Sequence, residues 1–313
     1  MVYWAVHSLR LLGQQISSDL ENRIVKFLKT CEAATGGYGG GPGQQAHLAT
    51  TYAAVMALCS IATDLALRSI NRTTLLEFLL RMKQPDGSFR MHADGETDIR
   101  GMYCALAVAS ITNVLNEKLV AAADSWVISC QTYEGGFGGC KGCEAHGGYT
   151  FCAVAAMVIL GRTRLIHVHS LLKWLAMRQR AFEGGFQGRT NKLVDGCYSF
   201  WQAACFPLVQ EIIATAHTET RQTWLFAQRA AQEYVLACCQ NTRHGGFRDK
   251  PGVHPDLYHT CYVLSGLSVA QHLFQDEIDV IGKPDNKVVA THPVYNITID
   301  CERKVREYFG GGN

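Results

Sequence analysis

Three side chains of metal-ligating type stand out in the sequence. Asp195 and Cys197 are separated by one residue, so both could reach one metal ion where the backbone turns into a helix, and both are accepted zinc ligand types. His259 lies near the start of the corresponding helix one internal repeat later. Taken singly, they could be a capping Asp, a core thiol and a structural His. Together they leave one tetrahedral position open, which is typical of a catalytic zinc.

Cationic side chains are found near these ligands. Arg189 and Lys192 precede the Asp-x-Cys pair, and His146 belongs to the preceding repeat. A solvated basic loop is the plain alternative, yet fixed cations beside glycine-rich backbone suit a diphosphate, and Tyr198 can add a hydroxyl. Asp249 adds a carboxylate that could hold a magnesium ion against such a group, although alone it would be only a turn residue.

Cys140 and Cys143 form a C-x-x-C pair, a spacing that is common in zinc and redox sites. The chain contains no second C-x-x-C pair to complete a four-thiolate site. We therefore interpret this pair as part of a loop.

An internal repeat positions these segments. Each unit has an amphipathic helix, a glycine-rich turn and a second helix, and the turns lie near residues 37, 87, 136, 185 and 246. The steps are 50, 49, 49 and 61 residues, so the last unit carries an insertion, which we place at about 214–223. Glycine pairs supply the positive φ that ends a helix. Asp98, Asp195 and Asp256 follow their turns at equivalent places, where each could cap the next helix.

The repeat predicts an all-α fold with about twelve helices in five or six hairpins. Units of this length, rich in aromatic residues, fit a closed ring better than an open solenoid. We predict an (α/α)6 barrel, or α-α toroid, with residues 1–313 as a single domain. The inner helices of such a barrel begin at one rim, so equivalent residues of adjacent repeats should lie side by side there.

Aromatic residues recur along the expected inner helices. An aromatic stripe is usually core. In a barrel of this size, however, an apolar tube that ends at cations and a metal would suit a long hydrocarbon diphosphate. The expected lining residues are Tyr103, Tyr149, Cys152, Trp201 and Tyr262, with Arg100 near them.

Composition excludes several classes of function. The 313 residues are 48% hydrophobic and carry a formal charge of +2, so we expect no nucleic-acid partner. Thirteen scattered cysteines predict reduced thiols and a cytoplasmic location. The longest nearly apolar run, 149–160, is too short to span a membrane.

Four long and specific motifs stand out in the second half of the chain: 144–152 (EAHGGYTFC), 192–202 (KLVDGCYSFWQ), 258–262 (YHTCY) and 291–297 (THPVYNI). On these the chain resembles the β subunits of the protein prenyltransferases, most closely the farnesyl-transferring ones. The resemblance implies a heterodimer with a separate α subunit. It also implies zinc at Asp195, Cys197 and His259, and diphosphate at His146, Arg189, Lys192 and Tyr198.

The activity that the resemblance implies is farnesyl transfer from farnesyl diphosphate to the cysteine of a C-terminal C-a-a-X motif, in proteins such as small GTPases. Zinc would hold that cysteine as thiolate, while Lys192, Tyr198 and magnesium at Asp249 would help the diphosphate leave. Trp4 and Tyr258 would face the peptide. A Trp that reads chain length in the family would fall just before Met1, so we expect an N-terminus that is truncated relative to the family.

Alternatives remain. A geranylgeranyl-transferring (type I) relative would share most of these residues, but such relatives resemble the chain less around 194–201 and lack a match to Asp249. A terpene cyclase would need an acid cluster, and the sequence has no Asp-Asp pair. A glycosidase would need paired carboxylates, and Asp195 and Asp256 could serve as that pair. A non-catalytic toroid that binds proteins would leave the three metal-ligating residues unexplained.

Overall fold

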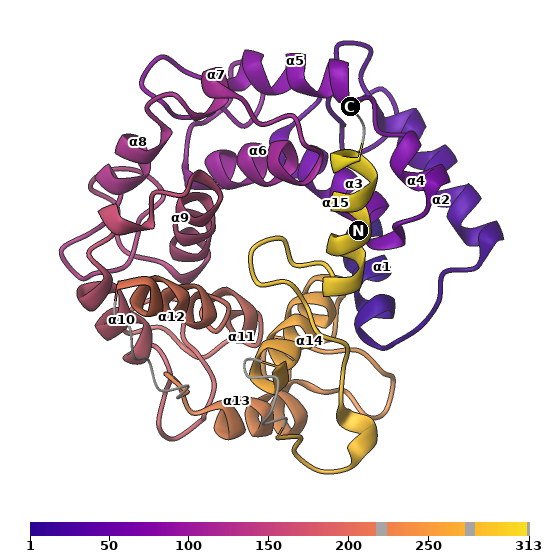
Figure 1. Cartoon of the computed structure of the whole chain (residues 1–313). Helices are drawn as coiled ribbons and strands as arrows, with labels where there is room; N and C mark the ends of the chain where they lie inside the picture. Colours follow the sequence, from indigo (N-terminus) through magenta and orange to yellow (C-terminus); the bar gives the residue numbers. More distant parts are fainter. Residues whose placement is uncertain (217–223, 273–278, 312–313) are drawn as a thin grey trace.

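The computed structural model describes residues 1–216, 224–272 and 279–311, with the side chains of 215 and 216 left aside. The predicted insertion at 214–223 therefore falls largely outside the described residues. Helices form a closed ring of two layers (Figure 1). The inner layer consists of α1 (Val2–Leu11), α3 (Leu48–Ile61), α6 (Ile99–Ile111), α9 (Gly147–Leu160), α11 (Tyr198–Trp201) with α12 (Cys205–Ala216), and α14 (Leu257–His272). Each packs on the next, and α14 returns to α1, which confirms the α-α toroid.

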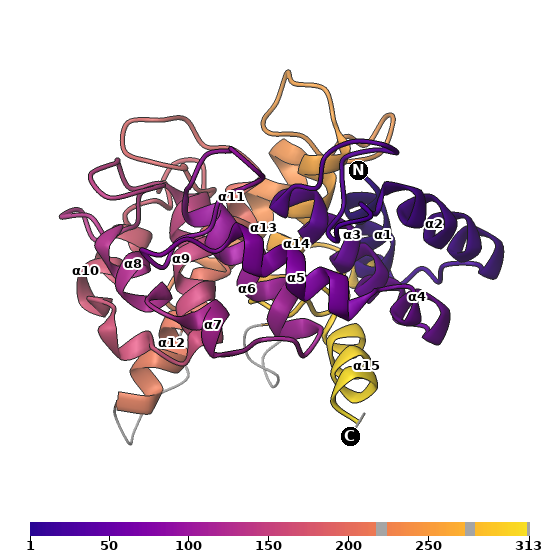
Figure 2. The ribbon, with the colours of Figure 1, turned by 90° about the horizontal axis from the view of Figure 1, so that it is seen from above.

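The outer layer follows in alternation with the inner one. It consists of α2 (Ser18–Cys31), α4 (Asp64–Arg68), α5 (Arg72–Met82), α7 (Glu117–Val120), α8 (Ala123–Ser129), α10 (Val168–Ala176) and α13 (Gln228–Tyr234). The last helix, α15 (Ile299–Gly310), extends from the lower edge of the ring in Figure 2 and packs against α3, α4 and α6. Short 3-10 helices lie at Thr163–Leu165 and Pro284–Asn286, and a π-helix lies at Val235–Cys239. The described residues form no β-strand beyond isolated bridges.

The sequence of each layer explains its place. Inner helix α9 reads Gly-Gly-Tyr-Thr-Phe-Cys-Ala-Val-Ala-Ala-Met-Val-Ile-Leu and buries most of its surface, because neighbours cover it on several sides. Outer helix α2 is amphipathic instead: it buries Ile24, Leu28 and Cys31 on one face and exposes charged residues on the other. The Ser17 side chain caps α2 by accepting a hydrogen bond from the Leu20 N–H.

Aromatic rings contact one another from helix to helix around the whole inner layer. The circuit runs through Tyr3, Tyr52, Tyr103, Phe151, Trp201, Tyr262, Tyr258 and Trp4, with centroids 4.3–5.8 Å apart. Such edge and tilted contacts add to the apolar burial that holds the ring closed. Its first and last members, Tyr3 and Trp4, both belong to α1, so the aromatic circuit is itself closed.

The repeat turns share one construction. An isolated antiparallel β-bridge joins the two ends of each turn, for example Gln131 with Phe137 and Gln179 with Phe186. A sixth turn, which the sequence repeat does not reveal, is clasped by Thr291 and Thr298. Asn296 has φ +52° in this turn, where the other turns use glycine, and Asn tolerates this left-handed region better than most residues.

The sixth turn reaches into the ring (yellow in Figure 1). Inner tyrosines bind its backbone: the hydroxyls of Tyr3, Tyr52 and Tyr103 donate to carbonyl oxygens of residues 294–296 at 2.6–3.1 Å. The turn therefore occupies one side of the ring interior.

The loops that precede α9, α11 and α14 all lie at one rim of the ring, the upper edge in Figure 2, on the side away from α15. Polar side chains stand at equivalent places at this rim in successive repeats. They are His47 and Asp98, which cap α3 and α6, His146, which caps α9, and Asp195 and Asp256 before α11 and α14. The fold thus gathers equivalent positions at one rim.

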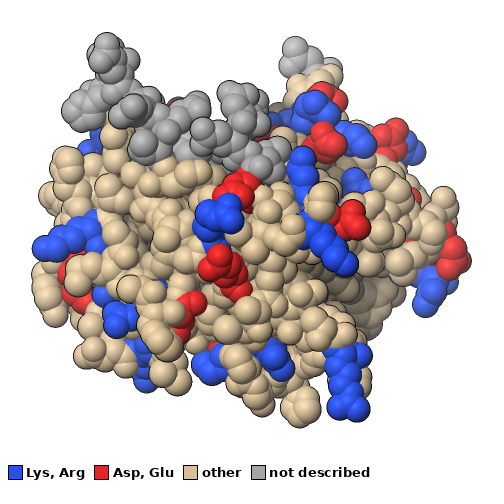
Figure 3. All heavy atoms as spheres, turned by 90° about the horizontal axis from the view of Figure 1, so that it is seen from below, with Lys and Arg blue, Asp and Glu red and all other residues tan. Residues whose placement is uncertain are grey.

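Charges of both signs are dispersed over the face shown in Figure 3, which agrees with the small net charge. Within the described parts of the chain, no helix combines the length and the apolar character that crossing a bilayer would need.

Candidate metal centre and anion-binding rim

Two inner helices bring the three predicted ligands together. Asp195 and Cys197 lie in the turn that leads into α11, and His259 lies in the first turn of α14. The two helices approach closely because Gly266 has no side chain: a Cβ there would lie 2.3 Å from the Ser199 carbonyl carbon.

The ligand atoms of Asp195, Cys197 and His259 all lie within 4.8 Å of one another. His259 Nε2 is 3.2 Å from Asp195 Oδ1, and the Cys197 backbone N–H donates to Asp195 Oδ1 at 2.8 Å. Cys197 is buried, whereas the other two residues are partly exposed. The three residues that the sequence singled out thus lie together as a possible metal site.

His259 is oriented by a second carboxylate. Its Nδ1 lies 2.6 Å from Asp256 Oδ2, and because the carboxylate can only accept, Nδ1 carries the proton. Nε2 is buried and has no hydrogen-bond partner, although Asp195 is near, because the contact lacks hydrogen-bond geometry. An imidazole held at Nδ1 by a carboxylate, with an Nε2 that can give up its proton to a metal ion, is the arrangement of metal-ligating histidines.

Electrostatics at this site favour a cation. Burial lowers the pKa of His259, but Asp195 and Asp256 outweigh burial and raise that pKa to about 9. Burial and the charge of Asp195 raise the pKa of Cys197 well above its usual range. Without a cation the triad therefore holds a proton on His259 and on the thiol. A divalent ion would replace these protons, because carboxylate, thiolate and neutral imidazole are all ligands for it.

The predicted anion-binding residues lie beside the metal centre. A hollow of about 420 Å³ is lined by His146, Gly188, Arg189, Asn191, Lys192, Leu193, Asp195, Tyr198 and Lys250. All four residues that the sequence assigned to diphosphate are included, and Asp195 joins the hollow to the metal centre. Lys250 is a further cation that sequence reasoning missed, since only its neighbour Asp249 drew notice.

Tyr198 has a hydroxyl that is free to donate. His146 Nδ1 accepts the Gly148 N–H at 3.1 Å, so the proton of neutral His146 lies on Nε2, 2.9 Å from the Tyr198 oxygen. Burial and the neighbouring Arg189 lower the pKa of His146, which keeps it neutral. His146 therefore donates to Tyr198, and the Tyr198 O–H can point to an anion.

Arg189 and Asp249 both have partners of opposite charge. Arg189 Nη1 donates to Glu144 Oε2 at 2.8 Å, an exposed pair that a strong anion can displace at small cost. The Asp249 carboxylate is bound by Lys250 Nζ and does not line the hollow. Magnesium at Asp249 would have to compete with the Lys250 ammonium.

The residues predicted to line an apolar tube, and the two predicted to face the peptide, Trp4 and Tyr258, differ in exposure. Tyr103, Cys152 and Tyr262 are buried, and the Tyr103 hydroxyl is engaged by the sixth turn. Tyr149, Trp201, Tyr258 and Trp4 are partly exposed near the rim. The Tyr258 oxygen accepts the Trp201 Nε1–H at 3.0 Å, which joins α14 to α11 within the aromatic circuit. Arg100 is exposed and paired with Asp98.

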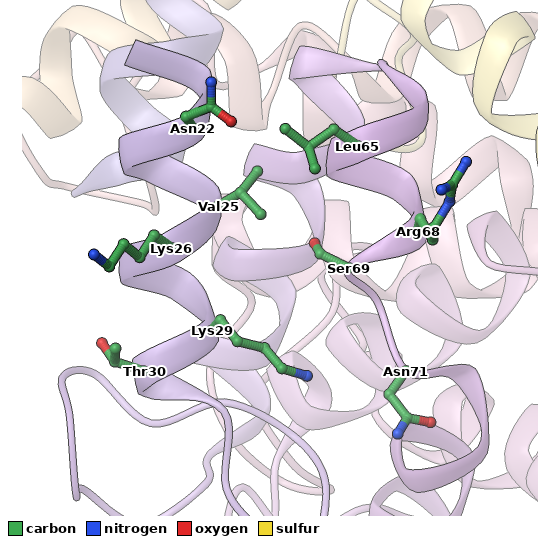
Figure 4. A pocket seen from close by; sticks show the side chains of 9 residues that line it. All are labelled: Asn22, Val25, Lys26, Lys29, Thr30, Leu65, Arg68, Ser69 and Asn71. Carbon is green, nitrogen blue, oxygen red and sulfur yellow. The ribbon is translucent and has the colours of Figure 1, made fainter. Parts of the chain in front are cut away.

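A second large hollow, about 880 Å³, lies on the outer layer between α2 and α4 (Figure 4). It is lined by Asn22, Val25, Lys26, Lys29, Thr30, Leu65, Arg68, Ser69 and Asn71. This lining contains no carboxylate, thiol or imidazole, and it lies away from the rim that carries the metal-ligating residues. We therefore place the functional site at the rim.

Comparison with known proteins agrees with this geometry. Residues 1–297 match the family model of the prenyltransferase alpha-alpha toroid domain. The chain is 42% identical to protein farnesyltransferase subunit beta of Pisum sativum, over 99% of this chain and 88% of that protein. The chain belongs to the protein farnesyltransferase subunit beta family. Geranylgeranyl transferase type-1 subunit beta of Arabidopsis thaliana is 35% identical over only 72% of this chain and 59% of that protein.

A solved structure supports the fold of this family member. Protein geranylgeranyltransferase-I of Candida albicans in complex with GGPP superposes with a TM-score of 0.78 at 22% identity, over 98% of this chain and 90% of that chain. At this identity the likeness concerns the toroid alone. The chain is thus a protein prenyltransferase subunit of the farnesyl-transferring group.

Proposed function

We propose that the chain transfers a farnesyl group from farnesyl diphosphate to the thiol of a cysteine in a C-terminal C-a-a-X motif, with zinc as the bound metal. The observation that carries this proposal is the position of Asp195, which belongs both to the Asp195–Cys197–His259 centre and to the cationic hollow. A site that binds a thiolate and a site that binds a diphosphate are therefore contiguous.

Asp195, Cys197 and His259 would hold the zinc ion, since this donor set is accepted by zinc and leaves a position for a further ligand. When bound, zinc would stabilise the substrate thiol as its thiolate at neutral pH. Asp256 keeps His259 in the tautomer that presents Nε2. The protein's own contribution is thus a preformed ligand set, with the imidazole already oriented.

The diphosphate would lie against His146, Arg189, Lys192 and Tyr198. Negative charge grows on this group as the bond to the farnesyl C1 carbon breaks, and fixed donors stabilise that charge more than they stabilise the ground state. The Tyr198 hydroxyl is oriented by His146, and Lys192 supplies a cation without a carboxylate partner of its own in the described residues. Lys250 adds a third cation to the hollow.

Magnesium would be a second metal, at Asp249. Its buried Oδ1 has no hydrogen-bond partner, and this free oxygen supports the assignment. The other oxygen is bound by Lys250, so magnesium would enter only when the diphosphate draws Lys250 away.

A separate α subunit would complete the enzyme. Tyr133 and Phe182 occupy equivalent places in adjacent repeat turns and are 99% and 98% exposed. Fully exposed aromatic residues at neighbouring positions support an apolar docking surface. The thirteen free cysteines fit a reducing compartment such as the cytoplasm.

The choice of isoprenoid can be tested directly. The chain is co-expressed with a prenyltransferase α subunit and given matched peptides that end in Ser or Leu, each with farnesyl or geranylgeranyl diphosphate. The proposal predicts farnesylation of the Ser peptide. Transfer mainly of geranylgeranyl to the Leu peptide would keep the chemistry and overturn the farnesyl assignment.

A further inference from the structure

Two thiols lie together at the functional rim without a part in the proposed reaction. Cys140 and Cys143 are the exposed cysteines of the chain, whereas the other eleven of the thirteen are buried or, for Cys238, half-buried. Cys140 Sγ lies 3.2 Å from Cys143 Sγ. The two sulfurs are in contact and open to small molecules in solution.

The backbone holds this pair in position. The Cys143 N–H donates to the Cys140 carbonyl at 3.1 Å, which closes a four-residue turn. Gly142 has φ +84° with open space around it, so the tight turn costs no steric strain there. Such a turn brings its end Cα atoms within about 7 Å, and a disulfide spans about 4.4–6.8 Å between Cα atoms. Forming the bond requires rotation of the two side chains with little movement of the loop.

We propose that Cys140 and Cys143 form a reversible disulfide by exchange with a low-molecular-weight disulfide, and that this bond regulates the anion-binding rim. The second part rests on the proposed function. One cysteine thiolate attacks the small disulfide, releases one small thiol and becomes a mixed disulfide. The other thiolate attacks the protein sulfur of that bond and releases the second small thiol. Two electrons pass to the small disulfide, and the two thiol protons end on the two released thiols.

The connection to the rim runs through the next residue. Glu144 follows Cys143 directly, and its Oε2 accepts the hydrogen bond from Arg189 Nη1 at 2.8 Å. Arg189 lines the cationic hollow, so Glu144 competes with an anion for this guanidinium. Cross-linking restricts the loop that carries Glu144 and makes its pairing with Arg189 more persistent. Oxidation should therefore weaken anion binding.

The small ring explains why the bond would be reversible. The stabilisation that a disulfide gives falls as the closed loop becomes shorter, and only two residues separate Cys140 from Cys143. Exposure of both sulfurs also allows a small thiol to reach the bond.

The first test maps the bond. The reduced chain is incubated with oxidised glutathione, quenched with an alkylating reagent and digested for mass spectrometry. We expect one peptide that links Cys140 to Cys143, restored to thiols by dithiothreitol. In a Cys140→Ser chain, Cys143 should instead retain glutathione, because no second thiol resolves the mixed disulfide. Glutathione retained on both cysteines of the unmodified chain, or the absence of any reaction there, would overturn the proposal.

The second test measures inorganic pyrophosphate binding by calorimetry, in the reduced and oxidised states. We expect binding about two- to threefold weaker after oxidation, the size that an exposed ion pair permits. The Cys140→Ser/Cys143→Ser and Glu144→Gln chains should show equal affinities before and after the glutathione treatment. Equal affinities in the unmodified chain would overturn the regulatory part. Failure of the reduced chain to bind pyrophosphate at all would instead count against the proposed function, and the peptide map would stand.

Discussion

Asp256 accepts the Nδ1–H of His259 at 2.6 Å and so determines which nitrogen of the ring faces Asp195. Asp256 directly precedes α14 and His259 lies three residues later, in the first turn of that helix, a spacing that places both side chains on one side of the helix start. The relationship gives Asp256 a role that a helix cap alone does not require. It also separates this site from a pair of hydrolytic carboxylates, because Asp195 and Asp256 flank a single imidazole.

Replacement of Asp256 by Asn should weaken metal binding about 10- to 100-fold, because the imidazole loses its orienting charge. The measurement is a zinc competition titration with a chromophoric chelator. Asp98→Asn is the matched control, since Asp98 caps α6 at the equivalent rim position without an imidazole partner. A comparable loss in both variants would mean that capping, and not the orientation of His259, explains the effect.

Cys197→Ala should abolish stoichiometric metal binding, because two remaining protein ligands cannot make a tight site. Cobalt substitution gives a direct readout: the unmodified chain should show thiolate-to-cobalt charge-transfer absorption, and the variant should lack it. Cys205→Ala, at a buried thiol in α12, should retain the absorption. Persistence of the band in Cys197→Ala would point to another thiolate ligand.

Gly266→Ala should destabilise the chain and weaken metal binding, since its methyl group would overlap the backbone of Ser199 and push α14 from α11. We expect a loss of about 1–3 kcal/mol, typical of overpacking, in urea unfolding. Gly310→Ala, in α15, meets nothing within 4 Å and should be neutral or slightly stabilising. Unchanged stability and zinc affinity in Gly266→Ala would show that the helix contact does not position the ligands.

His7 should make stability fall in mild acid. It is completely buried, with Nε2 3.1 Å from Asn296 Oδ1, and burial lowers its pKa to about 4. Between pH 4 and about 6.5 the unfolded chain binds a proton that the folded chain does not, so stability decreases as pH falls through this window.

The shift corresponds to about 3 kcal/mol across the full window. Urea unfolding of the chain and of His7→Phe at pH 7.5 and pH 5 isolates this contribution from that of the other histidines. The difference in stability between the two chains should shift in favour of the variant at pH 5. A difference that does not change with pH would contradict neutral burial of His7.

Much of the ring could be predicted from the sequence, because repeated glycines and apolar helices carry the period directly. Because equivalent positions of adjacent repeats lie side by side in such a ring, we could also predict that Asp195, Cys197 and His259 lie at one rim. The sixth turn was not predicted because Asn296 supplies the positive φ that glycine supplies in the other turns. The break between α11 and α12 was not predicted, although Pro207 marks it: proline has no N–H to donate to residue 203 and is tolerated only in the first turn of a helix, where it stands in α12.

The sequence could not predict which side chains pair with one another. Asp249 was predicted beside the diphosphate, but its carboxylate pairs with Lys250, and side-chain direction within a loop has no periodic signal. Cys140 and Cys143 were interpreted as an ordinary loop, and their sulfur contact depends on a turn that only the structure shows. Which side chains contact one another is set by their rotamers and by backbone hydrogen bonds.

The central claim is that a metal held by Asp195, Cys197 and His259 supports transfer of farnesyl to a thiol. The most direct measurement is farnesylation of a Ser-ending C-a-a-X peptide by the chain bound to a prenyltransferase α subunit, before chelation, after chelation, and after zinc is restored. We predict that activity disappears with the metal, returns with one zinc per heterodimer, and never appears in Cys197→Ala. Full activity in the metal-depleted enzyme would contradict the account.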